Sequence, residues 1–478
     1  MNNQRLELVA DFYEYTMSNG YLNKNMENQI AYFDVFFRKV PDEGGYAIVA
    51  GLEQIINYIK NISFDEEDIN YLRKQNKFSE DFLNYLENFR FTGDVWAIPE
   101  GTVVFPNEPL ITVRAPIIQA QLLETMLLLT TNHQSLIATK TSRIVKEAQG
   151  KPVMEFGARR AHGINAAVEG ARAAIIGGAI GTSCTLSAKE FNVPASGTMA
   201  HSWIQSFDSE YEAFKSYAEI YPDDCTLLID TYNTIESGLP NAIKVFNEVL
   251  KPKGYKPKAV RLDSGDLAYL SKKVRKILDE AGYADCKICA TNSLDEYLIK
   301  SLIEQDAKID SFGVGENLIT AKSEPVFGGV YKLVGIEKEN KIIPKIKVSE
   351  NVAKVTNPGF KKVYRFYDNE TQKAIADVIA LSDEIIDERE YMIFDPQNPW
   401  KKKLIKDYTI RELQEKIFEN GKLIYKSPTL KEIAMKSKKE LDSMWEEVKR
   451  IENPHKYYVD LSKKLWVLKN NMLNNIYF

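Results

Sequence analysis

The stretch that decides the fold begins VMEFGARRAHG, from Val153 to Gly163. A short apolar run over residues 153–156 ends in glycine and arginine, and the alanine-rich residues 165–176 that follow have helical spacing. Short strands that alternate with helices are typical of an α/β fold with a parallel sheet, either open or closed as a barrel. The further apolar runs are residues 179–184, 226–229, 259–262, 287–290 and 309–312.

Clusters of polar residues and glycine follow directly after these runs. In open α/β sheets and in α/β barrels, the active site lies at the carboxyl ends of the strands. We therefore expect the clusters to converge on one face and to form a site. They are residues 157–159, 230–233, 263–266, 291–293 and 313–317.

The remainder of the chain falls on either side of this central part. The N-terminal segment mixes helical and strand-like patterns, whereas the C-terminal segment is rich in lysine. There, Ser427-Pro428 has the pattern of a helix N-cap followed by proline. We predict an N-terminal α/β domain over residues 1–135, a central domain with the active site over residues 136–335, and a C-terminal region over residues 336–478. Part of that region is expected to pack on the N-terminal domain.

Composition and charge argue against several kinds of partner. Of the 478 residues, 44% are hydrophobic and 27% charged, and the net charge of −5 comes without an acidic or basic block, which argues against nucleic acid. The N-terminus has no basic segment followed by an apolar run, and no run approaches ~20 apolar residues, so we expect neither a secretory signal nor a membrane span. Four cysteines without an export signal favour the cytoplasm.

Cys286 and Cys289 form a C-x-x-C pair, a pattern found in redox sites and in halves of zinc sites. The surrounding residues have the pattern of a strand, in which side chains three positions apart point to opposite faces. The sequence has no second C-x-x-C pair, which a zinc site would need. We therefore expect structural cysteines here.

Two clusters carry side chains suited to a flat, negatively charged substrate. Arg159 and Arg160 offer planar forks of donors that fit carboxylate or phosphate, and Phe156 could stack on a flat ring. Surface ion pairs are an equally good interpretation of the two arginines. His201 lies among small residues, where it could act as a nucleophile or proton carrier, although a lone histidine is more often structural.

Two further clusters could bind a sugar phosphate. Arg261 and Asp263 share one face of a strand end, so they could hold a carboxylate and a ribose hydroxyl, or simply satisfy each other as an ion pair. Gly313 and Gly315 form a turn whose N–H groups could cradle a phosphate, although an ordinary tight turn has the same pattern. Their place in a late loop favours phosphate, because barrel phosphate sites commonly use late loops.

Taken in order along the chain, these segments resemble the nicotinate phosphoribosyltransferase family of type II phosphoribosyltransferases. The resemblance implies an irregular type II α/β barrel with an N-terminal α/β sandwich-like domain and a C-terminal accessory region. It extends from Asp11 to about Arg365. Its motifs are residues 11–13, 33–38 with 44–46, 155–159, 197–203, 261–265, 311–317 and 347–365.

The resemblance also implies the reaction. The family joins nicotinate to the ribosyl phosphate of phosphoribosyl pyrophosphate (PRPP), which gives nicotinate mononucleotide and pyrophosphate on the route to NAD. ATP hydrolysis is coupled to this reaction through a phosphohistidine, which matches His201. Mg²⁺ is implied as a cofactor that binds through PRPP near Asp230 and Asp263, without a fixed protein site. The implied assembly is a homodimer with shared active sites.

The resemblance assigns roles to individual side chains. Phe156 stacks on the pyridine ring, with Tyr13 from a neighbouring subunit on the other face, and Arg261 meets the nicotinate carboxylate. Asp263 joins Arg261 and His201 as the catalytic set, and lies near the ribose or its metal. The residues implied for PRPP and its phosphates are Arg38, Arg159, Asp230, Asn292, Gly313 and Gly315, with Lys347 and Lys354 in a more loosely matched segment.

One position distinguishes nicotinate from nicotinamide as the substrate. The related nicotinamide enzymes carry an aspartate after a Gly-Thr pair, whereas this chain reads Gly181-Thr182-Ser183. A carboxylate at position 183 would repel nicotinate, while a serine hydroxyl can donate a hydrogen bond to it. Ser183 therefore favours the acid over the amide.

Two other functions fit the same motifs in part. A quinolinate phosphoribosyltransferase would need cations for a second ring carboxylate and would release CO₂, and its family is much shorter. A non-catalytic protein that binds a nucleotide or PRPP would not need to keep Arg159, His201 and Arg261 together.

Overall fold

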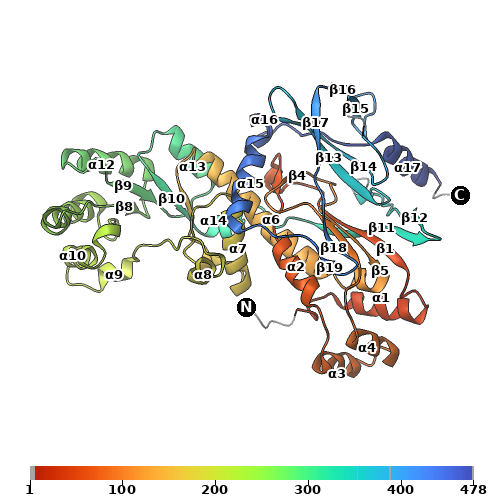
Figure 1. The fold of residues 1–478 in the computed structure, drawn as a ribbon. Coiled ribbons are helices and arrows are strands. Elements are labelled where there is room, and N and C mark those ends of the chain that lie inside the picture. Colours follow the sequence, from red (N-terminus) through yellow and green to blue (C-terminus); the bar gives the residue numbers. More distant parts are fainter. Residues whose placement is uncertain (1–5, 352–353, 387–388, 476–478) are drawn as a thin grey trace. The chain divides into compact units, whose positions relative to one another are not determined.

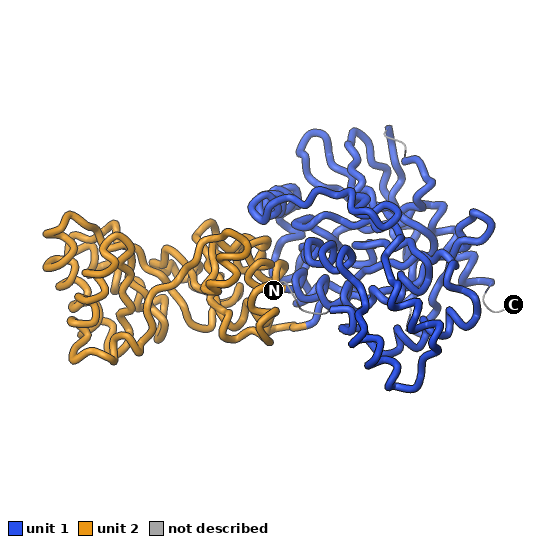
Figure 2. The backbone as a smooth tube through the Cα atoms, turned by 60° about the horizontal axis from the view of Figure 1, so that its bottom comes forward, with its two compact units in different colours: residues 1–136, 326–478 blue, residues 137–325 orange. Residues whose placement is uncertain are grey.

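The computed structural model describes residues 6–351, 354–386 and 389–475. The chain divides into two compact units, of which unit 1 is Met1–Leu136 with Val326–Phe478 and unit 2 is Ile137–Pro325 (Figure 2). Helix α6, Glu124–Glu147, contributes residues to both units. Among the predicted site residues, Tyr13, Arg38, Lys347 and Lys354 belong to unit 1, and the others belong to unit 2.

Unit 2 is built on a parallel sheet of five strands in the order β6-β10-β9-β8-β7 (Figure 1). Most strand residues are buried, as expected for a parallel sheet covered on both faces, which explains the apolar runs in the sequence. The strands are β6 Val153–Glu155, β7 Thr226–Leu228, β8 Ala259–Leu262, β9 Lys287–Ala290 and β10 Ser311–Val314. The α-helices after α6 are α7 Ile164–Ile176, α8 Thr185–Phe191, α9 His201–Gln205, α10 Glu210–Ile220, α11 Leu239–Val245, α12 Leu267–Glu280, α13 Glu296–Glu304 and α14 Glu316–Ile319.

The strand expected at residues 179–184 forms only in part. In this fully described stretch, Thr182 makes isolated parallel bridges to Glu155 and Ala195, and the backbone groups of residues 180, 181 and 183 hydrogen-bond with those of Val153 and Glu155. Glycine explains the difference. Gly178 has a φ of +107°, and a Cβ added to Gly181 would lie 2.6 Å from Ser196 Oγ. Beyond β6, pairing therefore continues through single bridges, which makes this part of the α/β unit irregular.

Cys286 and Cys289 are buried, with Cys289 inside β9 and Cys286 directly before it, and both thiols are free. Burial raises the pKa of the Cys286 thiol to about 12, which keeps the thiol protonated and unreactive. The pair is structural, as its position in a strand predicts. Within the described residues, no group of three or more His, Cys, Asp or Glu side chains is placed to hold a metal ion.

Unit 1 contains a seven-stranded antiparallel sheet in the order β12-β11-β1-β5-β3-β18-β19. This order places β1 between β11 and β5, so strands from both ends of the chain share one sheet. The strands are β1 Ile30–Phe36, β3 Asp94–Ala97, β5 Ile111–Pro116, β11 Val330–Lys338, β12 Lys341–Pro344, β18 Glu415–Glu419 and β19 Lys422–Leu423. A small pair accompanies them, β2 Ala47–Ile48 with β4 Val103–Val104.

A second sheet in unit 1 has the order β17-β13-β14-β20, and the hairpin β15–β16 packs Ile393 and Ile405 against its core. These strands are β13 Lys361–Asp368, β14 Ala374–Leu381, β15 Glu390–Phe394, β16 Lys402–Lys406, β17 Tyr408–Glu412 and β20 Val459–Leu461. The helices of unit 1 are α1 Phe12–Asn23, α2 Leu52–Asn61, α3 Glu66–Lys74, α4 Glu80–Glu87, α5 Ile117–Gln121, α15 Leu430–Asp442, α16 Glu446–Lys449 and α17 Lys463–Asn474. In the described part of the chain, no helix combines the length and apolar character needed to cross a membrane.

Helix α15 begins two residues later than its sequence predicts, so the expected N-cap at Ser427 is wrong. The N-cap is Thr429, whose hydroxyl accepts a hydrogen bond from the Glu432 backbone N–H. The Glu432 carboxylate in turn accepts from the Thr429 N–H at 2.7 Å. This reciprocal capping box satisfies two backbone donors that Ser427 followed by proline would leave open.

A fully buried ionic network joins the C-terminal strands of unit 1 to its N-terminal segment. Arg365 of β13 donates to both carboxylate oxygens of Asp377 on β14, at 2.8 and 2.6 Å. It also donates to the carboxylate of Glu440 on α15 and to the carbonyl oxygen of Val103. Tyr457 donates to Asp377 at 3.0 Å. The network therefore ties residues from both ends of the chain into one core.

We predict that Asp377→Ala lowers the free energy of unfolding of unit 1 by about 3–5 kcal/mol, because it leaves a buried arginine charge without its main partner. The measurement is chemical denaturation followed by tryptophan fluorescence. The control is Lys464→Ala, which removes the exposed pair with Asp383 and should leave the stability almost unchanged. Equal effects of the two substitutions would contradict a structural role for the network.

Candidate active site

The carboxyl ends of the parallel strands of unit 2 lie at one edge of the sheet. Ala290, the last residue of β9, pairs with Leu262, the last residue of β8, and with Phe312 of β10. Val314, the last residue of β10, pairs with Glu155, the last residue of β6. The polar clusters that follow these strands therefore converge, as the sequence predicts.

Arg261 is held rigidly at the end of β8. Its Nε donates to Thr291 Oγ1 at 3.0 Å, and its Nη1 donates to Thr198 Oγ1 and to the carbonyl oxygen of Met199, both at 3.1 Å. Its Nη2 donates to Asp263 Oδ1 at 3.1 Å. These bonds use four of the five guanidinium N–H groups and leave one on Nη2 for a ligand. The ion pair with Asp263 therefore forms, but it leaves one N–H donor of the guanidinium available.

Asp263 is a shared acceptor that stays ionised. Its Oδ1 accepts from Arg261 and from the Thr291 hydroxyl, and its Oδ2 lies 3.6 Å from His201 Nε2. Burial alone would raise the pKa of Asp263, but the hydrogen bond from Thr291 and the charge of Arg261 outweigh it and hold that pKa below its usual value. A fixed negative charge therefore stands between Arg261 and His201.

Asp230, which follows β7, supports the turn after β8. Its Oδ2 accepts from the Asp263 backbone N–H at 2.8 Å and from Ser264 Oγ at 2.6 Å. Its Oδ1 is buried and, within the described residues, has no hydrogen-bond partner. An unpaired buried carboxylate oxygen is costly, so this atom is a candidate for a ligand hydroxyl or a cation.

His201 is the first residue of α9, and its side chain is 40% exposed, which leaves it accessible to a substrate. Its Nδ1 lies 3.0 Å from the hydroxyl oxygen of Thr231, two residues beyond the apolar run of β7. The ring is therefore positioned from both edges, by Thr231 at Nδ1 and by Asp263 at Nε2. This arrangement differs from that of a buried structural histidine.

Phe156 packs directly against the β10 turn. Its backbone N–H donates to the carbonyl oxygen of Val314 at 2.7 Å. A Cβ added to Gly313 would lie 2.5 Å from Cδ2 of the Phe156 ring, so any larger residue would displace the ring. This close contact alone explains why position 313 is glycine, so the glycine is not evidence for a phosphate site. The phosphate role of Gly313 and Gly315 stays a prediction.

Ser183 belongs to a segment that Glu155 fixes beside Phe156. The buried Glu155 carboxylate accepts from the Gly157 N–H and from Thr182 Oγ1, and the Glu155 carbonyl oxygen accepts from the Ser183 N–H at 2.8 Å. Burial raises the pKa of Glu155, although these hydrogen bonds oppose the shift. The Ser183 side chain remains exposed, so its hydroxyl is available to a ligand.

The remaining predicted residues of unit 2 lie on the exposed rim. Arg159 is exposed and, in the described part of the chain, makes no polar contact. Asn292 follows β9 with a φ of +87°, a left-handed conformation that asparagine tolerates, and its side chain is exposed. Asn292 Oδ1 accepts from Ser293 Oγ at 3.2 Å. Both side chains are accessible to a substrate.

Tyr13 and Arg38 belong to unit 1. Tyr13 lies on α1 and is 43% exposed, and its contact with a neighbouring subunit stays a prediction. Arg38 follows β1, and its buried Nε has no hydrogen-bond partner among the described residues. Burial lowers the pKa of Lys332; the charge of Glu124 opposes this shift, and the charges of Lys347 and Arg38 add to it. Among the described residues, the Lys354 backbone N–H donates to the carbonyl oxygen of Asn351 at 2.8 Å.

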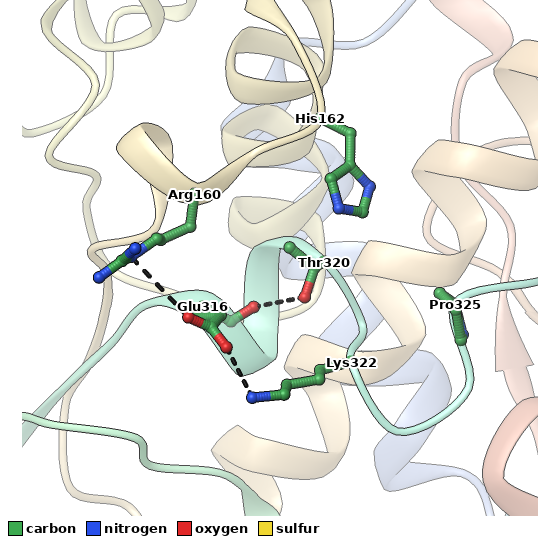
Figure 3. Close-up of a pocket in the computed structure, with 6 residues that line it drawn as sticks. All are labelled: Arg160, His162, Glu316, Thr320, Lys322 and Pro325. Atoms are coloured by element: carbon green, nitrogen blue, oxygen red, sulfur yellow. Dashed lines mark hydrogen bonds and ion pairs between the residues drawn. The ribbon is translucent and has the colours of Figure 1, made fainter.

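A pocket of about 310 Å³ opens beside the β10 turn of unit 2. Figure 3 shows Arg160 and Lys322 on different sides of Glu316, and His162, Thr320 and Pro325 complete the lining. Arg160 Nε and Lys322 Nζ lie 3.8 and 2.6 Å from the Glu316 carboxylate. For Arg160, the interpretation as a surface ion pair is therefore correct.

Sequence reasoning missed the threonines that position the site. Thr198 and Thr291 hold Arg261, Thr231 contacts His201, and Thr182 holds Glu155. The sequence pattern could have identified Thr231 and Thr291, because both lie in the predicted polar clusters at the ends of strands. Their hydroxyls were overlooked because those clusters also contain charged residues.

Three family models match the chain. The nicotinate phosphoribosyltransferase N-terminal domain matches residues 8–132, the nicotinate phosphoribosyltransferase family model matches residues 152–378, and the C-terminal domain matches residues 360–469. Together they reach from the N-terminal sheet through the active-site unit to the C-terminal strands.

Known proteins resemble the chain along nearly its whole length. It is 45% identical to the nicotinate phosphoribosyltransferase of Bacillus subtilis (strain 168), over 98% of this chain and 96% of that protein. Identity to the enzyme of that name from Caenorhabditis elegans is 34%, over 96% of this chain and 92% of that one.

Solved structures share the fold. The crystal structure of human nicotinic acid phosphoribosyltransferase matches with a TM-score of 0.86 and 26% identity, over 97% of this chain and 99% of that one. A nicotinate-nucleotide pyrophosphorylase from Pyrococcus furiosus matches in fold alone, with a TM-score of 0.71 and 24% identity, over 93% of this chain and 97% of that one. The mixed α/β fold expected from the resemblance is confirmed, and the chain belongs to the nicotinate phosphoribosyltransferase family.

Proposed function

We propose that this chain condenses nicotinate with PRPP to form nicotinate mononucleotide and pyrophosphate, with ATP hydrolysis coupled through phosphorylation of His201. The observation that carries the proposal is the 45% identity over 98% of the chain to the Bacillus subtilis protein. The convergence of Arg261, Asp263 and His201 at one edge of the sheet supports it. We propose further that the enzyme is a cytoplasmic homodimer with shared sites, to which Tyr13 and Arg38 contribute.

The chemistry explains why the site is rich in arginine, aspartate and glycine. The pyridine nitrogen of nicotinate already has a free lone pair, so the reaction has little need of a general base. The difficult step is the breaking of the bond between ribose and pyrophosphate, through a cationic ribosyl transition state. Positioning of the reactants and electrostatic stabilisation should therefore supply most of the rate enhancement.

The geometry suits nicotinate in three respects. The free N–H on Arg261 Nη2 can donate to the substrate carboxylate, and the other four N–H bonds hold the guanidinium ready for it. Phe156 offers a ring on which the pyridine can stack. The exposed Ser183 hydroxyl can add a second donor to the carboxylate.

Asp230 fits a ligand from PRPP. Its buried Oδ1 lacks a partner in the described part of the chain, so a ribose hydroxyl or a cation would satisfy it. Mg²⁺, when bound with PRPP, would neutralise charge on the pyrophosphate, and Asp230 with Asp263 are the residues that would hold it. Arg159 and Asn292, which are free on the rim, are proposed to bind phosphate oxygens.

We predict that the purified enzyme releases pyrophosphate from PRPP with nicotinate, and not with nicotinamide or quinolinate. Ser183→Asp should raise KM for nicotinate by roughly 100-fold, because a like charge at this position costs several kcal/mol. The assay measures pyrophosphate with each ring compound, with and without ATP. Ser183→Asn, which has a similar shape and no charge, is the control. No release with any of the three compounds would favour a binding protein over an enzyme.

We predict that Arg261→Ala raises KM for nicotinate by roughly 10- to 100-fold and changes KM for PRPP far less, because it removes a charged hydrogen-bond donor to the carboxylate. Initial rates with each substrate varied in turn provide the measurement. Arg261→Lys keeps the charge but loses the planar fork, so an intermediate value is expected. Equal effects on both substrates would refute this role.

We predict that incubation with ATP places an acid-labile phosphate on the wild-type protein and none on His201→Ala. The ring of His201 is exposed and held at both edges, which suits it as a nucleophile. Radiolabelled ATP followed by acid and base treatment measures the phosphate. His162→Ala, which alters an exposed histidine elsewhere in unit 2, should retain it. A labelled His201→Ala protein would exclude His201 as the acceptor.

A further inference from the structure

Glu155 connects two segments that each carry a side chain of the proposed nicotinate site. It is the last residue of β6, directly before Phe156, and it is fully buried. Its backbone N–H donates to the Gly181 carbonyl oxygen at 2.9 Å, and its carbonyl oxygen accepts from the Ser183 N–H at 2.8 Å. The backbone of Glu155 therefore joins the proposed stacking ring to the proposed donor for the substrate carboxylate.

The carboxylate of Glu155 adds a bond to each of the two segments. Its Oε1 accepts from the backbone N–H of Gly157, a group that can only donate. Its Oε2 lies 2.6 Å from Oγ1 of Thr182, which is also fully buried. The link between Glu155 and Thr182 is the same whichever of these two oxygens holds the proton. The carboxylate therefore ties the turn after Phe156 to the residue before Ser183.

The backbone of Ser183 is held from both sides. Thr182 precedes it and is bound by the carboxylate of Glu155. Cys184 follows it, and the Cys184 N–H donates to Thr182 Oγ1 at 2.9 Å. The Ser183 side chain is exposed although its backbone is fixed, so the direction in which it presents its hydroxyl depends on Thr182 and Glu155.

Phe156 is held in a similar way. Its N–H donates to the carbonyl oxygen of Val314 at 2.7 Å, and the N–H of the next residue, Gly157, donates to the carboxylate of Glu155. The ring packs so closely on Gly313 that a Cβ there would lie 2.5 Å from Cδ2 of the ring. The ring and the Ser183 hydroxyl are thus presented from fixed backbone, and one buried side chain joins the two segments.

We propose that Glu155 is a positioning residue that fixes the spacing between the ring of Phe156 and the hydroxyl of Ser183. It acts through Thr182. This inference rests on the proposed binding of nicotinate, in which the pyridine stacks on Phe156 while its carboxylate accepts from Ser183. A hydrogen bond weakens steeply when its distance and angle change, whereas offset stacking tolerates sliding of the ring. Loss of the spacing should therefore weaken the contact with the carboxylate most.

The test compares Thr182→Val, which removes the hydroxyl and keeps the shape, with Thr182→Ser, which keeps the hydroxyl. Initial rates of pyrophosphate release give KM for each substrate. KM for nicotinate should rise on the order of tenfold in Thr182→Val, the effect of one weakened hydrogen bond to a charged group, and should recover in Thr182→Ser. KM for PRPP should stay near its wild-type value. The matched control is Thr226→Val, which changes a buried threonine at the amino end of β7, away from the site.

A double-mutant cycle with Ser183→Ala separates positioning from a general structural role. If Thr182 acts by orienting the Ser183 hydroxyl, Thr182→Val should raise KM for nicotinate in the wild-type background and change it little in the Ser183→Ala background. Additive effects of the two substitutions would assign the change to a general loosening of unit 2, and they would overturn the inference.

Glu155→Gln provides a second variant. Its amide oxygen can accept from the Gly157 N–H and its amide nitrogen can donate to Thr182 Oγ1, so both links are kept and KM for nicotinate should rise less than in Thr182→Val. A larger rise would contradict the inference. A Thr182→Val enzyme with the wild-type KM for nicotinate, or with equal rises in both KM values, would overturn the role of Glu155 and leave the proposed reaction intact. A wild-type protein that releases no pyrophosphate with nicotinate would overturn both.

Discussion

The carboxylate of Asp263 is the contact on which the arrangement of the site depends. One of its oxygens accepts from Arg261 and from Thr291, and the other faces His201. These groups come from three separate segments, β8, the end of β9 and the start of α9. They meet because β8 and β9 pair in parallel, with Leu262 opposite Ala290. A register shift between β8 and β9 would separate Arg261 and Asp263 from Thr291, whose hydroxyl contacts both side chains.

Two arginines show how the same hydrogen bonds can serve structure or function. Arg365 and Arg261 each make four hydrogen bonds, and each pairs with an aspartate. Arg365 and Asp377 are 0% exposed, so no ligand can reach them, and their network only stabilises unit 1. The side chains of Arg261 and Asp263 are 14% and 26% exposed. Because this ion pair is partly exposed, a ligand can reach it, and its rigid geometry makes it a preorganised binding site.

The sequence predicted the parallel sheet and the convergence of polar strand ends, because local apolar runs and the residues after them determine both. The sequence-based prediction failed where contacts between distant segments determine the structure. After the turn at Gly178, an expected strand is reduced to isolated bridges at Thr182. The pairing of β1 with β11 joins residues 300 positions apart, which no local pattern reveals. The ordered motifs indicated the reaction, but the threonine hydroxyls that position Arg261 and His201 required the structure.

The surroundings of Ser183 also bear on the choice of serine at this position. Among the described residues, the buried Glu155 carboxylate has no basic partner, and burial raises its pKa. Ser183 donates its N–H to the carbonyl oxygen of this same residue, so the two are adjacent. An aspartate at 183 would add a second carboxylate to the segment that Glu155 holds, and in the proposed binding mode it would repel the substrate carboxylate. Serine avoids this repulsion, so the proposed preference for nicotinate and the exposed position of the side chain favour the same residue.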